Sequence, residues 1–86
     1  MDIDAVLQKV KTDRPTAIDM VYDELDSLLL AKRFGEVQLI LVEFLKRDDV
    51  PMSILLSAWI VTKPWRNDLR YAWVGLDQQV QYEYSR

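Results

Sequence analysis

The chain has 86 residues, half of them apolar, and a formal net charge of −3, so we expect one compact domain over residues 1–86 and not a disordered segment. Two glycines and three prolines leave few turn residues, which argues against an all-β fold. Histidine and cysteine are absent, and neither glycine belongs to a phosphate-binding motif, so we expect no enzyme, no cofactor and no metal site.

Two helices are predicted in the N-terminal part of the chain from apolar residues spaced three and four positions apart. The first covers about residues 2–11, and Pro15 ends its pattern, because the residue before a proline is disfavoured in a helix. Thr16 is the expected N-cap of the second helix, which extends to about Lys32. Acidic residues early in this helix and basic residues late in it both suit the helix dipole.

The C-terminal part predicts three further helices. Residues 34–36, which include Gly35, are the expected corner before a third helix over about residues 37–47. A loop at residues 48–51 leads to a helix from Pro51 to about Thr62. A turn over residues 64–67 then precedes a last helix, for which Asn67 or Asp68 is the expected cap.

The stretch from Val50 to Thr62, VPMSILLSAWIVT, contains no charge in a chain that is 29% charged. It is too short to span a bilayer, which takes about 20 apolar residues. A helix that is apolar on all sides must be covered on all sides. The sequence therefore predicts an all-α bundle of four main helices plus a short N-terminal helix, stacked as antiparallel hairpins around this central helix. If four helices do not cover it, a homo-oligomer would.

Residues 25–51 resemble one helical hairpin of the tetratricopeptide type. The residues that carry the resemblance are Leu25, Leu28, Leu29, Phe34, Glu36, Val37, Leu41, Phe44 and the closing Pro51. That family has small residues where this chain has Val37 and Phe44, and its proline comes sooner. The resemblance implies an antiparallel helical hairpin and carries over no binding residue.

Two groups of side chains are candidates for binding a partner. Asp19, Asp23 and Asp26 share one face of the second helix. They are interpreted as a solvated face, as a docking patch for a basic partner, or as hard oxygen ligands for a metal ion, although a straight helix arranges ligands in a row and not around an ion.

The second group combines basic and aromatic residues: Lys63, Trp65, Arg66 and Arg70. Such a cluster can stack on nucleotides or anchor a protein interface, in which Trp and Arg are enriched. The alternative is that Trp65 closes the end of the bundle and the basic side chains are only solvated.

These observations predict a small non-catalytic protein-interaction module, such as an adaptor, an inhibitor or an assembly subunit. The alternative is a nucleic-acid-associated regulator that uses the residue 63–70 patch, which the negative net charge disfavours. The lack of cysteine favours a cytoplasmic location. Acidic residues near the N-terminus, where a secretory signal would carry basic ones, predict no targeting segment, and no membrane partner is expected.

Overall fold

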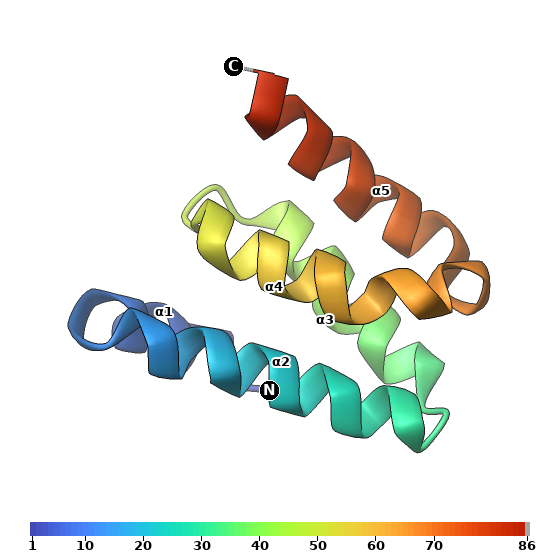
Figure 1. Ribbon diagram of the computed structural model, residues 1–86, viewed down its shortest axis with the longest axis horizontal. Helices are drawn as coiled ribbons and strands as arrows, with labels where there is room; N and C mark the ends of the chain where they lie inside the picture. Colours follow the sequence, from blue (N-terminus) through green and yellow to red (C-terminus); the bar gives the residue numbers. More distant parts are fainter. Residues whose placement is uncertain (86) are drawn as a thin grey trace.

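The computed structural model describes residues 1–85, which form helices and no strand (Figure 1). The elements are α1 (Ile3–Thr12), α2 (Arg14–Leu30), α3 (Phe34–Lys46), α4 (Met52–Thr62), the 3-10 turn η1 (Lys63–Trp65) and α5 (Arg66–Ser85). The radius of gyration is 11.9 Å, close to the value of about 12 Å for a compact domain of this length. The predicted all-α compact fold is confirmed.

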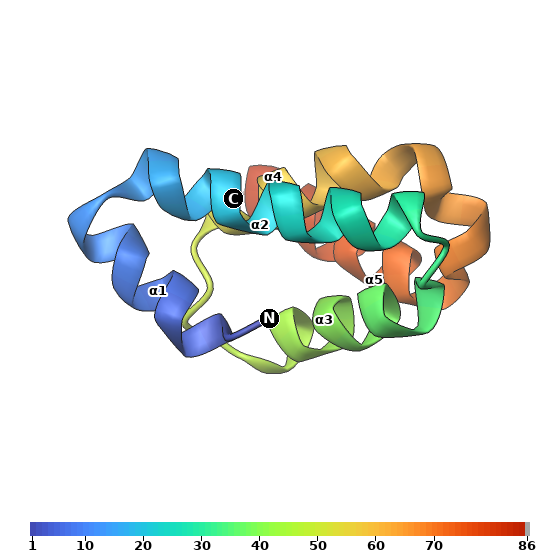
Figure 2. The ribbon, with the colours of Figure 1, turned by 90° about the horizontal axis from the view of Figure 1, so that it is seen from below.

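Helices that are not consecutive in the chain pack against one another. α2 packs against α4 and α3 packs against α5, while α1 packs against α2. In Figure 1, α2 and α4 run side by side in one direction, and α3 and α5 run in the opposite direction. Figure 2 shows α2 on one side of the molecule, with α1 and α3 on the other. This arrangement brings the α2–α3 and α4–α5 connections to the same end of the molecule (Figure 1).

The core lies along the facing stripes of the helices. Its fully buried large side chains include Val21, Leu25 and Leu29 of α2, Val37, Leu41 and Phe44 of α3, Ile54 of α4, and Leu69, Leu76 and Val80 of α5. Each burial of this kind contributes about 1.5–3 kcal/mol relative to exposure. One continuous apolar core therefore joins all four of these helices.

The apolar helix α4 is not covered on all sides within one chain, and a homo-oligomer that covers the rest stays a prediction. Its buried hydroxyls are satisfied: Ser57 Oγ donates to the Ile18 carbonyl at 3.3 Å and Thr62 Oγ1 to the Ala58 carbonyl at 2.6 Å. Ile60, however, is 56% exposed. Apolar residues that face solvent singly are common in folded proteins.

Within residues 1–85, no helix has the length and apolar character needed to cross a membrane.

The start of α2 differs from the prediction. Asp13, and not Thr16, is the N-cap, and its carboxylate accepts from the Thr16 backbone N–H at 3.3 Å and from the Thr16 hydroxyl at 2.6 Å. Pro15 belongs to the first turn of the helix, where a missing N–H leaves no hydrogen bond unmade. Pro15 is therefore part of the start of α2 and not part of a linker between α1 and α2.

The two connections at the shared end also differ from the prediction. The α2–α3 corner is formed by residues 31–33, and Gly35 already lies inside α3. After α4 the chain continues through η1 directly into α5, so neither Asn67 nor Asp68 caps a separate helix. The turn instead comes later, at Arg70, whose φ of 51° and ψ of −125° kink α5.

Candidate functional site

The connections α2–α3 and α4–α5 touch through the half-buried side chain of Trp65. The Lys32 ammonium lies 4.7 Å from the centroid of the Trp65 ring, within cation–π distance. The Phe34 ring packs on the same indole with its centroid 5.7 Å away. Trp65 therefore joins the two connections.

This contact brings together basic residues that are far apart in the sequence. We call the cations of residues 30–38 and 62–70 the basic end. They are Lys32, Arg33, Lys63, Arg66 and Arg70. The same two segments contain only two carboxylates, Glu36 and Asp68, and Glu36 pairs with Arg33. These segments carry a balance of +3, five cations minus two acids, in a chain whose net charge is −3.

Two members of the basic end have left-handed backbone conformations. Lys32, at φ 60°, and Arg70, at φ 51°, are the only non-glycine residues with positive φ among residues 1–85. Lys32 follows the C-cap of α2, where its own N–H bonds to the Leu29 carbonyl at 3.0 Å and the next N–H to the Leu28 carbonyl at 2.9 Å. Glycine is the usual residue at that position of this helix-ending motif. A cation stands at both places where glycine would relieve backbone strain.

The aromatic rings near the basic end are occupied by internal contacts. The Lys63 ammonium lies 4.5 Å from the centroid of Trp59, which stacks on Trp73 with centroids 6.3 Å apart. The Trp59 indole N–H donates to the Asp77 carboxylate at 2.8 Å. Trp59 and Trp65 are therefore each covered in part by a lysine. Tyr71, by contrast, is 74% exposed beside Arg70.

The acidic candidates lie apart from the basic end, along α2. Asp19 and Asp23 are exposed and Asp26 is half-buried. Within residues 1–85, no group of three or more acidic side chains has an arrangement that could hold a metal ion. Asp23 lines a groove between α1 and α2, which Asp19 and Asp26 do not line.

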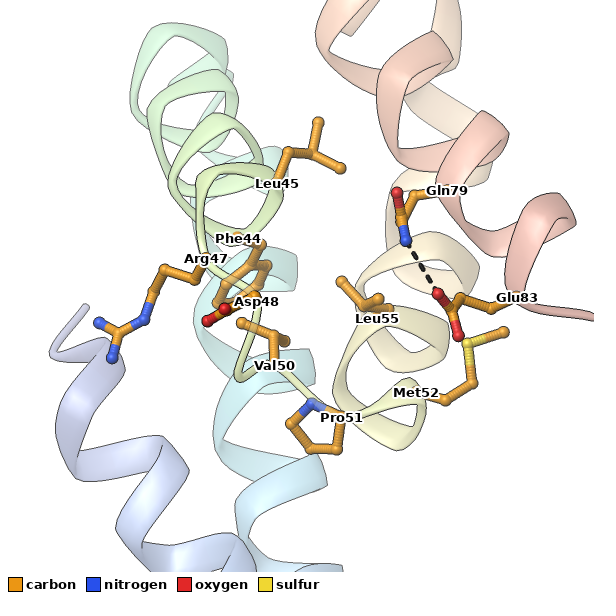
Figure 3. Close-up of a pocket in the computed structure, with 10 residues that line it drawn as sticks. All are labelled: Phe44, Leu45, Arg47, Asp48, Val50, Pro51, Met52, Leu55, Gln79 and Glu83. Carbon is orange, nitrogen blue, oxygen red and sulfur yellow. Dashed lines mark hydrogen bonds between the residues drawn. The ribbon is translucent and has the colours of Figure 1, made fainter.

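A separate cavity of about 540 Å³ lies between the end of α3, the start of α4 and α5 (Figure 3). Both apolar and polar residues line it, and the Gln79 amide donates to Glu83 at 3.1 Å on the α5 side. In Figure 3 the Arg47 side chain points away from α4 and α5 toward α1. It is held there by Asp4 at 2.8 Å and Asp49 at 2.9 Å. None of the six sequence-predicted site residues lines this cavity.

The ion pairs of Arg47 fix the α3–α4 loop. The hydrogen bonds that Arg47 donates to the Asp49 and Asp4 carboxylates raise the pKa of Arg47 above its ordinary value. The bond to Arg47 in turn lowers the pKa of Asp49. Arg47 therefore ties the loop to α1 and is not available to a ligand as an unpaired cation.

Sequence reasoning identified Trp65, Arg66 and Arg70 but missed Lys32 and Arg33. The basic pair at the end of α2 was interpreted only as a complement to the helix dipole. The signal that could have found them is topological. The α2–α3 and α4–α5 connections lie at the same end of the molecule because α2 and α4 run in one direction and α3 and α5 run in the other (Figure 1).

Comparison with known proteins found no matching family, no similar curated protein and no similar solved structure.

Proposed function

We propose that this chain is a small non-catalytic interaction module that binds an acidic segment of a partner protein at its basic end. The observation that carries the proposal is the contact of the two connections at Trp65, because residues 30–38 and 62–70 contain five cations and two carboxylates. The contacts of α2 with α4 and of α3 with α5 suit two antiparallel hairpins stacked on one another. We place the module in the cytoplasm because it lacks cysteine.

Backbone strain supports a binding role for these cations. A non-glycine residue in a sparsely populated backbone region costs about 1–3 kcal/mol, and such residues cluster at functional sites. Lys32 and Arg70 both occupy such regions, and both are cations of the basic end. A purely structural turn would be more stable with glycine at either position. The presence of Lys32 and Arg70 there therefore favours a binding function.

The surroundings of the cations favour a protein partner over a nucleic acid. Binding of single strands relies on open aromatic faces on which bases stack. Here Lys32 lies over Trp65 and Lys63 lies over Trp59. The exposed apolar side chains in and beside these segments, Leu30 and Tyr71, suit a segment that mixes acidic and apolar residues.

The test compares two anionic probes of equal charge. One is a labelled peptide of about 12 residues in which glutamate alternates with leucine, and the other is a single-stranded oligodeoxythymidine; both are titrated by anisotropy at low and physiological salt. We expect the peptide to bind more tightly than the oligonucleotide. The reverse order would replace this proposal with the nucleic-acid function.

A matched pair of triple variants locates the site. Lys63→Gln, Arg66→Gln and Arg70→Gln together remove three charges from the basic end. The control removes three exposed cations elsewhere: Lys11→Gln, Arg14→Gln and Lys46→Gln. We expect about tenfold weaker peptide binding in the first variant and little change in the control, since each exposed pair contributes about 0.2–1 kcal/mol. Equal weakening in both would mean that net charge, and not the basic end, attracts the peptide.

A further inference from the structure

A second surface, unrelated to the basic end, lies between α1 and α2. It is a groove of about 390 Å³ with the buried Val6 and the exposed Ala5 at its α1 side and Met20 on α2. Met1 and Met20 both line the groove, and Met20 is 38% exposed. Methionine side chains are flexible and polarizable, and they adapt to different apolar partners. The groove therefore offers an apolar floor that can adjust to a docked side chain.

The rim of this groove is acidic. Asp2, Asp23 and Glu24 line it, and no lysine or arginine side chain does. The N-terminal ammonium of Met1 lies 3.6 Å from Glu24. Asp2 caps α1 by accepting from the Ala5 N–H at 3.1 Å. An occupant of this groove must present apolar side chains to its floor and positive charges to its rim.

The acidic row continues along α2 beyond the groove. Asp19 lies one helical turn before Asp23, and Asp26 lies about one turn after it, so the row extends for about 10 Å along the helix axis. This spacing matches the spacing of basic residues on one side of a partner helix. A hydrophobic groove is also a common binding site for an amphipathic helix of a partner.

We infer that the α1–α2 groove binds a basic amphipathic helix of a partner protein. Its apolar residues contact Met1, Met20 and Val6, and its lysines or arginines face Asp19 and Asp23. This site is independent of the proposed function, because it involves other residues and the opposite charge. With both sites occupied, the chain would act as an adaptor between an acidic and a basic partner.

The two surfaces act separately in physiological salt. Asp23 lies seven residues before Leu30, the last residue of α2, which corresponds to about 10 Å along the helix, and Lys32 lies beyond that end. The screening length at physiological ionic strength is about 8 Å, so exposed charges at this distance interact weakly. Removal of the acidic row should therefore leave the binding of the acidic peptide at the basic end almost unchanged.

The experiment uses a designed peptide of about 18 residues in which leucines follow the helical period and lysines fill the other positions. Its affinity for the full chain is measured by calorimetry at physiological salt. The variants are Asp19→Asn with Asp23→Asn, and separately Met20→Gln, which leaves the charge unchanged. The control for charge is Glu43→Gln with Asp48→Asn, two exposed acids outside the groove.

We expect the peptide to bind the wild-type chain, with about tenfold weaker binding in the Asp19/Asp23 variant and in the Met20 variant, and little change in the control. Equal weakening in the control would overturn the inference, because attraction to net negative charge would then explain the binding. No binding to the wild-type chain would also overturn it. So would a concentration-dependent dimer that the Asp19/Asp23 variant abolishes, because the occupant would then be a second copy.

Discussion

Replacement of Arg70 by glycine should stabilise the fold, although it removes a charged side chain. Arg70 has φ 51° and ψ −125°, a region that residues with a Cβ rarely adopt. Relief of that strain contributes about 1–3 kcal/mol. The greater freedom of glycine in the unfolded chain opposes it by about 0.5–1 kcal/mol. The expected net gain is therefore about 1 kcal/mol.

Arg70→Ala is the matched control, because alanine keeps the Cβ and therefore the strain while it removes the same guanidinium. Arg70 is exposed, so neither change empties a packed site. For a domain of this size, 1 kcal/mol raises the melting temperature by about 4–8 °C. We expect Arg70→Gly to melt higher than Arg70→Ala by this amount, as followed by circular dichroism.

The same two variants should weaken the binding of the acidic peptide equally, because both lack the guanidinium. A glycine variant that is more stable but binds less would show that the wild-type chain retains strain for function. If Arg70→Gly melts at or below the temperature of Arg70→Ala, the backbone at this position is not strained and the reasoning is refuted.

Three other substitutions test the packing and the charges of the fold. Leu55→Ala should destabilise the fold by about 2–5 kcal/mol in urea unfolding, because it opens a cavity in the buried face of α4; a loss below 1 kcal/mol would contradict a core position. Asp77→Ala should cost about 1–3 kcal/mol, because the Trp59 N–H loses its acceptor; an unchanged midpoint would show that water replaces it. Hydrogen bonds from Thr16 hold the pKa of Asp13 below its ordinary value of 3.8, so its contribution is present above that pH and is lost as the pH falls through the folded pKa. The stability of Asp13→Asn should therefore fall less than that of the wild type on acidification below about pH 4, and parallel curves would contradict the cap.

Much of the fold was predictable because local patterns decide it. The buried residues Val21, Leu25 and Leu29 recur with the helical period, and so do Val37 and Leu41 in the next helix. These stripes fixed the existence of the helices and the all-α class. The residue 48–51 loop and the helix after it also followed from the position of a proline.

The ends of the helices were harder, because similar residues compete for each position. Thr16 and Asp13 are both good caps, and the choice depended on whether Pro15 starts a helix or separates two. At the next corner, Gly35 was expected to make the turn, yet Lys32 adopts the left-handed conformation and Gly35 is helical. The favourable backbone of glycine therefore did not decide where the turn formed.

The candidate site was predictable only in part, because it depends on how the helices pack. Trp65, Arg66 and Arg70 are close in sequence and were visible as a cluster. Lys32 joins them only because the α2–α3 connection packs on the same indole. The exposed part of α4 around Ile60 also depends on packing, since the sequence does not show which side of an apolar helix remains uncovered.

The most direct test of the basic end is a titration of the ¹⁵N-labelled chain with the alternating glutamate–leucine peptide, followed by amide chemical shifts. If the two connections form one surface, residues 31–36 and 63–71 should shift together and saturate at the same peptide concentration. Shifts in only one of these segments, or mainly along α1 and α2, would contradict a binding site built from both connections.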